Sequence, residues 1–129
     1  MSSPSSIEAP LTKEIIACFY EVYNERRYGF PENIYANSLA VELQLRGLAF
    51  KKELVHEVVY KAVVVGLCRF DIVVEDRVLV EVKTGKDLHE ADKQQIRSYL
   101  KASPIEVGLL LHFGPQPKAL RFIHTNDQK

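Results

Sequence analysis

Two carboxylates and a lysine, Asp71, Glu81 and Lys83, stand in a stretch of otherwise apolar residues in the middle of the chain. Most of their neighbours are β-branched or aliphatic, a composition typical of strands. A carboxylate in such a run must face water or have a partner, because burying an unpaired charge is costly. If the three side chains converge, they would form a site for a divalent cation that suits the hydrolysis of phosphodiesters.

The geometry of this stretch can be derived from the alternation of strand side chains. One face of the first strand would hold Asp71 and the other would hold the apolar Phe70, Ile72 and Val74; on the second strand, Glu81 and Lys83 share a face with Leu79. A three-residue turn at residues 75–77 would pair Val74 with Val78 and set Asp71 opposite Glu81. Like charges in that position destabilise a hairpin, and a divalent cation would reverse the penalty.

A two-residue turn would break this alignment. In that case the carboxylates would lie on the solvated face of an antiparallel hairpin, with Lys83 as a neighbouring counter-charge. The hairpin alone does not decide between the two interpretations.

Length and charge limit the classes of protein that this chain can represent. It has 129 residues, 47% of them hydrophobic, which is enough for one globular domain with a substantial core. Seventeen basic and seventeen acidic residues give a net charge of zero, which argues against a strongly basic, sequence-indifferent nucleic-acid coat. Local basic patches are conceivable at residues 26–27, 51–52 and 83–86, although each also fits solvated surface charge.

Cys18 and Cys68 lie in apolar contexts and are expected to be buried free thiols in a reducing compartment, the cytoplasm, rather than a disulfide or zinc site. No apolar run approaches the roughly 20 residues of a membrane span. We expect residues 1–10 to form a disordered tail without signal-peptide character, residues 11–124 to form a single domain, and residues 125–129 to form a C-terminal tail.

The periodicity of apolar residues predicts an α/β (α+β) fold with the order α-α-β-β-β-α-β-β and a mixed β-sheet flanked by helices. Thr12 is a plausible N-cap of the first helix, and Pro31 and Gly47 suit the start and end of the second. The expected helices span residues 11–26, 31–47 and 87–102. The expected strands span residues 49–60, 63–66 (which begins or continues a meander), 69–75, 78–83, 107–113 and 119–123.

Two further polar residues fall on helix faces that are expected to turn inward. Glu32 shares a stripe with Tyr35, Leu39 and Leu43, although an acid in the first turn of a helix is also favoured by the helix dipole. Gln95 shares a side of the third helix with Leu88, Ala91 and Tyr99, where a boundary glutamine is the simpler interpretation. Both side chains could reach one end of a sheet that carries Asp71, Glu81 and Lys83.

The chain resembles the GxxExxY family over roughly residues 11–123. The resemblance rests on these segments: GFPENIY at 29–35, LQLRGL at 43–48, VYK at 59–61, DIVVED at 71–76, VEVK at 80–83, QIRSYLK at 95–101 and VGLLL at 107–111. It implies a branch of the PD-(D/E)xK nuclease superfamily with a restriction-endonuclease-like fold.

By this resemblance Asp71, Glu81 and Lys83 match the D…ExK core, Glu32 matches the acidic residue of the preceding helix, and Gln95 matches the glutamine of the following helix. The departures from the pattern are Phe70 in place of a proline, Ala62 in place of a glycine, His112 where an asparagine is common, and Glu53 at a usual glutamine position. None of these departures removes an expected metal ligand, and His112 is expected to be a strand-end histidine rather than a site residue.

The implied activity is a metal-dependent nuclease. Asp71, Glu81 and the backbone carbonyl of Val82 would bind Mg²⁺ or Mn²⁺, and Glu32 would hold the same ion, or a second one, through water. Lys83 would position or deprotonate the attacking water and neutralise the phosphate, and Gln95 would orient water or substrate.

The expected partner is nucleic acid, with DNA the first choice, and a homodimer or a protein partner could add basic surface. Two alternatives stay open at this point. One is a catalytically weak or inactive module that binds nucleic acid, and the other is an interaction protein whose polar cluster is structural.

Overall fold

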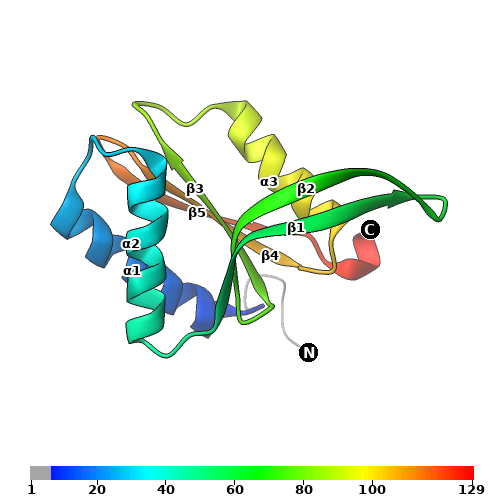
Figure 1. The fold of residues 1–129 in the computed structure, drawn as a ribbon, viewed down its shortest axis with the longest axis horizontal. Coiled ribbons are helices and arrows are strands. Elements are labelled where there is room, and N and C mark those ends of the chain that lie inside the picture. The colour runs from blue at the N-terminus through cyan, green and yellow to red at the C-terminus, as the bar shows by residue number, and fades with distance from the viewer. Residues whose placement is uncertain (1–6) are drawn as a thin grey trace.

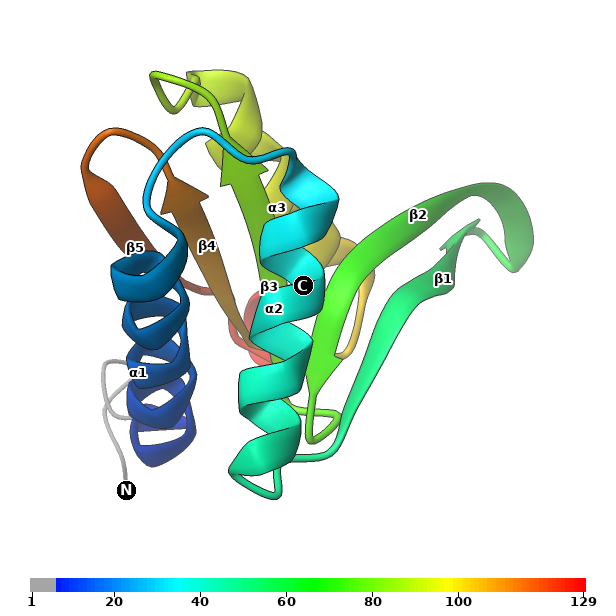
Figure 2. The ribbon, with the colours of Figure 1, turned by 60° about the vertical axis from the view of Figure 1, so that its left-hand side comes forward.

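The computed structural model describes residues 7–129 and contains one five-stranded sheet with helices on both faces (Figures 1 and 2). The element order matches the predicted order, and the α+β class with a mixed sheet is confirmed. In chain order the elements are α1 (Ala9–Arg26), α2 (Glu32–Leu45), β1 (Phe50–Tyr60), β2 (Val63–Val74), β3 (Val78–Thr84), α3 (Glu90–Ala102), β4 (Val107–Phe113), β5 (Pro117–Ile123) and a short 3₁₀ helix, η2 (Asn126–Gln128).

The strands follow each other across the sheet in chain order, β1-β2-β3-β4-β5. Only β3 and β4 run parallel, and α3 forms the crossover between them; the other neighbours are antiparallel. A parallel pair needs such a crossover, which carries α3 over one face of the sheet while α1 and α2 cover the other (Figure 2). The central strands are therefore buried on both faces and consist of nearly continuous apolar residues.

Two hydrophobic cores lie on opposite faces of the sheet. The first packs α1 and α2 against the sheet through fully buried aromatic and aliphatic side chains, among them Ile15, Phe19, Tyr35, Leu39, Leu43, Ile72, Val80, Val82, Leu111 and Phe113. The second lies under α3 and is built from Cys68, Phe70, Val73, Leu79, Ile96, Leu100, Ile105 and Leu110. The predicted apolar stripe of the second helix, Tyr35, Leu39 and Leu43, is confirmed by this packing.

Secondary structure extends past the expected bounds of the domain, into residues 9–10 and 126–128. Helix α1 begins at Ala9, with Pro10 in its first turn, so the interpretation of Thr12 as the N-cap is wrong. Thr12 lies inside the helix, where its hydroxyl donates to the carbonyl of Ala9 at 3.1 Å. At the other end the Lys129 ammonium donates to two backbone carbonyls at 2.7 Å. The first six residues of the expected N-terminal tail lie outside the described residues.

Strands β1 and β2 bend away from the sheet and continue as a two-stranded arm, residues 54–70 (Figures 1 and 2). The bend lies at Glu53 and Asp71, because Lys52 pairs with Ile72 and Leu54 with Phe70 while the residues between them are left out of the pairing. Glu53 has a left-handed φ of 52°, which is typical of an irregular position in a strand.

The bend also switches the faces of β2. Phe70 packs under α3, whereas Ile72 faces α1 and α2. The expectation that Phe70 shares a face with Ile72 and Val74 is therefore wrong, since regular alternation does not continue through Asp71.

Helix α3 faces the sheet through a different stripe from the predicted one. Ile96 and Leu100 are its buried residues, Gln95 and Tyr99 lie at the edge of the interface, and Ala91 is exposed. The helix begins at Glu90 rather than residue 87, because the His89 side chain and the Asp92 carboxylate form a capping box at its start.

Cys18 and Cys68 are both buried free thiols, as predicted. Burial raises the pKa of each thiol, which keeps it in the neutral form. None of the helices within residues 7–129 combines the length and apolar character needed to cross a bilayer.

Candidate metal and active site

The β2–β3 hairpin closes with the three-residue turn that the sequence predicted. Val74 pairs with Val78, and the N–H of Arg77 donates to the carbonyl of Val74 at 2.9 Å. Two of the turn residues, Glu75 and Asp76, have left-handed φ values of 54° and 55°. This register, continued along the strands, sets Asp71 opposite Glu81.

Side chains replace the backbone pairing of β2 and β3 at this position. The last backbone pair is Ile72 with Val80. Beyond it, the N–H of Asp71 donates to Glu81 Oε2 at 2.9 Å, and the N–H of Val82 donates to Asp71 Oδ2 at 2.8 Å. Each carboxylate therefore caps the opposite strand where the ladder ends, and the two acids are held beside each other by backbone groups rather than by flexible side chains.

The electrostatics of the site favour the binding of positive charge. Burial first, and then the neighbouring Asp71 carboxylate, raise the pKa of Glu81 to about 8, and the Glu81 residue is only 2% exposed. Burial also raises the pKa of Asp71, although the Val82 N–H and Lys83 oppose the shift. In the ionised form the pair carries a charge that the surrounding protein does not fully compensate.

Lys83 lies next to these acids and is fixed by the third helix. Its ammonium donates to Gln95 Oε1 at 2.9 Å and lies 3.9 Å from Asp92 Oδ1. Lys83 and Glu81 alternate with the buried Val82 along β3, so both belong to the face that α3 covers. Gln95 thus contacts the site through Lys83.

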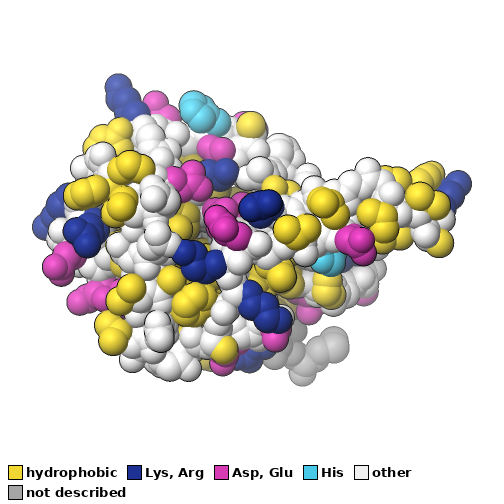
Figure 3. All heavy atoms as spheres, in the orientation of Figure 1, with side chains coloured by type: hydrophobic (Ala, Val, Ile, Leu, Met, Phe, Trp, Pro, Cys, Tyr) yellow, Lys and Arg dark blue, Asp and Glu magenta, His cyan; other side chains and the backbone are white. Residues whose placement is uncertain are grey.

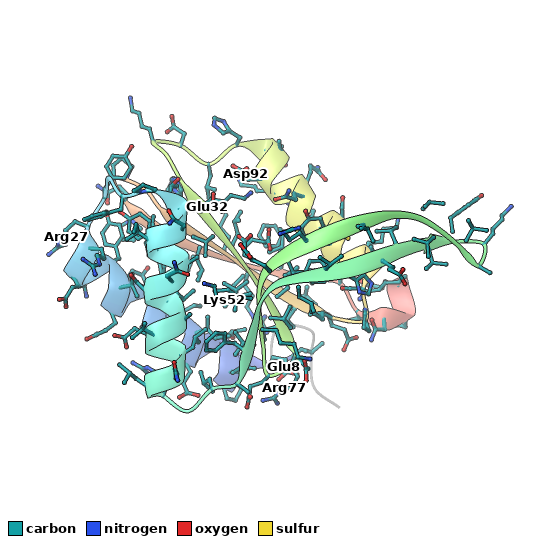
Figure 4. The ribbon with its side chains drawn as sticks, in the orientation of Figure 1. Glu8, Arg27, Glu32, Lys52, Arg77 and Asp92 are labelled. Atoms are coloured by element: carbon teal, nitrogen blue, oxygen red, sulfur yellow. The ribbon has the colours of Figure 1, made fainter. Side chains whose placement is uncertain are left out.

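Glu32 lies at the start of α2 (Figure 4) and lines a cavity together with Asp71. The cavity has a volume of about 240 Å³, and its lining includes Glu32, Lys52, Glu53 and Asp71. Although much of Glu32 is open to solvent, partial burial and the nearby Asp71 raise its pKa. The five residues predicted to converge therefore do lie around one end of β3.

The side chain of Tyr35 holds in place the loop before α2, and with it the position of Glu32. Its ring is fully buried and stacks on Phe113, with ring centroids 4.2 Å apart. Its hydroxyl donates to the carbonyl of Arg27 and accepts from the N–H of Phe30 at 3.2 Å. The tyrosine therefore fastens the loop before α2 to the core, which fixes where the helix and its first acid begin.

Three further side chains at the site were not singled out as site residues from the sequence. Asp92 is in the first turn of α3, one turn before Gln95, and that spacing was a usable signal. The sequence predicts Lys52 as part of a basic patch or as surface charge, whereas in the structure its ammonium bonds to Asn37 and it lines the cavity. Glu53 reaches the cavity because β1 is irregular there. Figure 4 shows Glu32, Lys52 and Asp92 coming from α2, β1 and α3.

His112 supports the site from β4 without reaching the acids. It pairs in register with Lys83 and is buried, and its Nε2 lies 2.8 Å from the carbonyl of Gly85 just after β3. These contacts agree with the interpretation of His112 as a strand-end histidine.

The donor set suits a hard divalent cation that keeps several waters. Within residues 7–129, no three histidine, cysteine, aspartate or glutamate side chains are gathered closely enough to hold an ion by themselves. Mg²⁺, however, is commonly held by one or two carboxylates with water in its remaining positions. Asp71 and Glu81 supply that number, and their raised pKa values, caused first by burial, show that each carboxylate is poorly solvated when it is ionised.

This fold and site define an α+β protein that carries two strand carboxylates and a lysine at the bend of a mixed sheet. The model of the PD-(D/E)XK nuclease superfamily matches residues 9–122, and the chain belongs to that superfamily. The narrower assignment to the GxxExxY family stays a prediction. No match was found among curated proteins.

A solved structure, the crystal structure of SSO0001, has a similar fold, with a TM-score of 0.55 and 18% sequence identity. The alignment covers 74% of this chain and 51% of SSO0001, so this chain spans about half of that protein.

Replacing Gln95 with leucine is expected to lower any metal-dependent cleavage by roughly ten- to a hundredfold, the usual cost of removing a group that orients a site residue. The reason is that Lys83 loses the acceptor that fixes its ammonium. Initial rates with saturating Mn²⁺ measure the effect. Gln94→Leu is the matched control, since Gln94 is exposed on the same helix and lines a different cavity; equal losses in both variants would contradict the role.

Proposed function

We propose that this chain is a metal-dependent nuclease that hydrolyses phosphodiester bonds of nucleic acid, DNA first among the candidates. The observation that carries the proposal is the meeting of Asp71 and Glu81 across the end of the β2–β3 ladder, with Lys83 beside them on the same face. Membership of a nuclease superfamily supports the activity, and the carboxylate pair supports the use of Mg²⁺ or Mn²⁺.

In the proposed reaction Asp71 and Glu81 would hold the cation, together with the backbone carbonyl of Val82. When bound, a divalent cation neutralises charge on the phosphate and lowers the pKa of a coordinated water. Lys83 stabilises the charge that develops on the phosphate and positions the attacking water, and Gln95 keeps its ammonium in place. Glu32 lines a cavity together with Asp71 and would hold the ion through water.

Incubation of the purified chain with single- and double-stranded DNA and RNA, in Mg²⁺, Mn²⁺ or EDTA, tests the function. Cleavage that needs the cation is the expected result, and the substrate panel shows which nucleic acid is cut. Failure to cut any substrate with either cation would overturn the proposal.

A second candidate is a nucleic-acid-binding module of the same fold without useful turnover. One oxygen of each carboxylate already accepts a backbone N–H, which leaves fewer oxygens free to hold a cation. This candidate predicts binding that weakens steeply with salt and no cleavage. The two buried free thiols support a reducing compartment such as the cytoplasm for either function.

A further inference from the structure

The arm, residues 54–70, exposes an unusual amount of apolar surface. Of the twelve large hydrophobic residues exposed within residues 7–129, seven belong to the arm: Val55, Val59, Tyr60, Val63, Val64, Val65 and Leu67, each 48–66% exposed. Figure 3 shows hydrophobic side chains over much of the arm, whereas charged side chains of both signs are mixed over the body. Contiguous apolar patches of this kind mark interaction sites.

The rest of the described chain covers only one face of the arm. Leu54 and Val58 pack against the core under α3, and His56 Nε2 lies 2.9 Å from the carbonyl of Ala102. Among residues 7–129, β1 is an edge strand of the sheet and pairs with β2 alone. The edge and the apolar residues of the arm are therefore available to a partner, and long exposed apolar edge strands are normally protected.

We propose that the arm is the dimerisation surface of this chain and that a second copy covers it. Tyr60 and Val63 pair with each other and continue the face of Val58, so they lie on the other side of the arm from Val55 and Leu67. The remaining five apolar residues expose about 450 Å² on each copy, and a pair of arms would bury about 900 Å² in total, which is the size of a weak and reversible interface.

The charges of the arm are compatible with an interface between two identical surfaces. In a two-fold dimer each surface must complement its own copy. The arm presents the acid Glu57, which pairs across the strands with Leu67, and the base Arg69, which pairs with Val55. A two-fold arrangement can set Glu57 of one copy against Arg69 of the other on both sides of the axis. A polyanion is a poorer partner, because apolar residues outnumber Lys61 and Arg69, and Glu57 repels it.

The dimer does not depend on the proposed nuclease activity, since the arm begins where the site ends and contributes no site residue. Sedimentation equilibrium of the full chain across the micromolar range tests it. The expected result is a reversible monomer–dimer equilibrium, and Leu67→Lys should raise the dimer dissociation constant by about a hundredfold, because it places a charge in the buried centre of the interface. Leu45→Lys, on α2 and 76% exposed, is the matched control and should leave the constant unchanged.

A charge exchange makes the test independent of apolar packing. Glu57→Arg and Arg69→Glu should each weaken the dimer, because each creates like-charge contacts, and the double variant should restore it. Circular dichroism verifies that these exposed substitutions leave the fold intact. A chain that stays monomeric, one that forms open-ended aggregates, or one whose dimer responds equally to Leu67→Lys and Leu45→Lys would overturn the proposal. A double variant as weak as the single ones would do the same.

Discussion

Asp71→Asn is expected to lower cation-dependent cleavage about a thousandfold and, at the same time, to stabilise the metal-free fold. A cation that polarises the phosphate contributes several kcal/mol to the transition state, and losing about 4 kcal/mol costs about three factors of ten. The amide keeps an oxygen that can accept the N–H of Val82, so the end of the ladder is preserved. The neutral amide removes the cost of burying the Asp71 charge and lets Glu81 ionise more easily, which should add about 1 kcal/mol to the free energy of unfolding.

The two effects have opposite signs, and this separates a metal site from a structural cluster. Cleavage rates in Mn²⁺ and urea denaturation in EDTA measure them on the same preparation. Asp76→Asn is the matched control, since Asp76 is an exposed acid in the turn of the same hairpin and pairs with Lys51 at the surface. Unchanged cleavage by Asp71→Asn would exclude Asp71 as a ligand. A loss of stability would show that its carboxylate supports the fold.

The convergence of Asp71 and Glu81 could be predicted from the sequence because it depends on the length of the hairpin turn alone. Once the turn holds three residues, the pairing of Val74 with Val78 fixes every later pair in the hairpin. The helices before the hairpin could also be predicted. In the second of them, for example, Tyr35, Leu39 and Leu43 follow a single helical stripe. Local spacing was sufficient in both cases.

The bend at Glu53 and Asp71 could not be derived in this way. The sequence pattern of a strand predicts which face of the sheet each side chain occupies, because successive side chains alternate between the faces. The alternation is broken where one residue of each strand is left out of the pairing. Both faces of the sheet are buried, so Phe70 and Ile72 are apolar whichever helix they face, and the sequence carries no signal of the switch. The position of Glu53 beside the site follows from this bend, which is why only the structure revealed it.

The structure makes a further prediction about pH. In EDTA, the free energy of unfolding is expected to fall as the pH rises from about 5 to 8. Burial and the Asp71 carboxylate hold the pKa of Glu81 at about 8 in the folded chain, above its ordinary value of 4.5. The folded state therefore retains a proton that the unfolded chain has lost, and each pH unit in this window removes up to about 1.4 kcal/mol. The pKa values of Asp71 and Glu32 are raised as well, so their contributions have the same sign.

Urea denaturation at several pH values measures this slope, and Glu81→Gln should remove most of it because the amide does not titrate. Glu25→Gln, an exposed position on α1, serves as the matched control. Saturating Mn²⁺ should flatten or reverse the slope in the unsubstituted chain, since a cation binds the ionised carboxylates and stabilises the fold more as they lose their protons. A slope that Mn²⁺ leaves unchanged would mean that the buried pair is a structural feature that binds no cation, and the catalytic proposal would lose its physical basis.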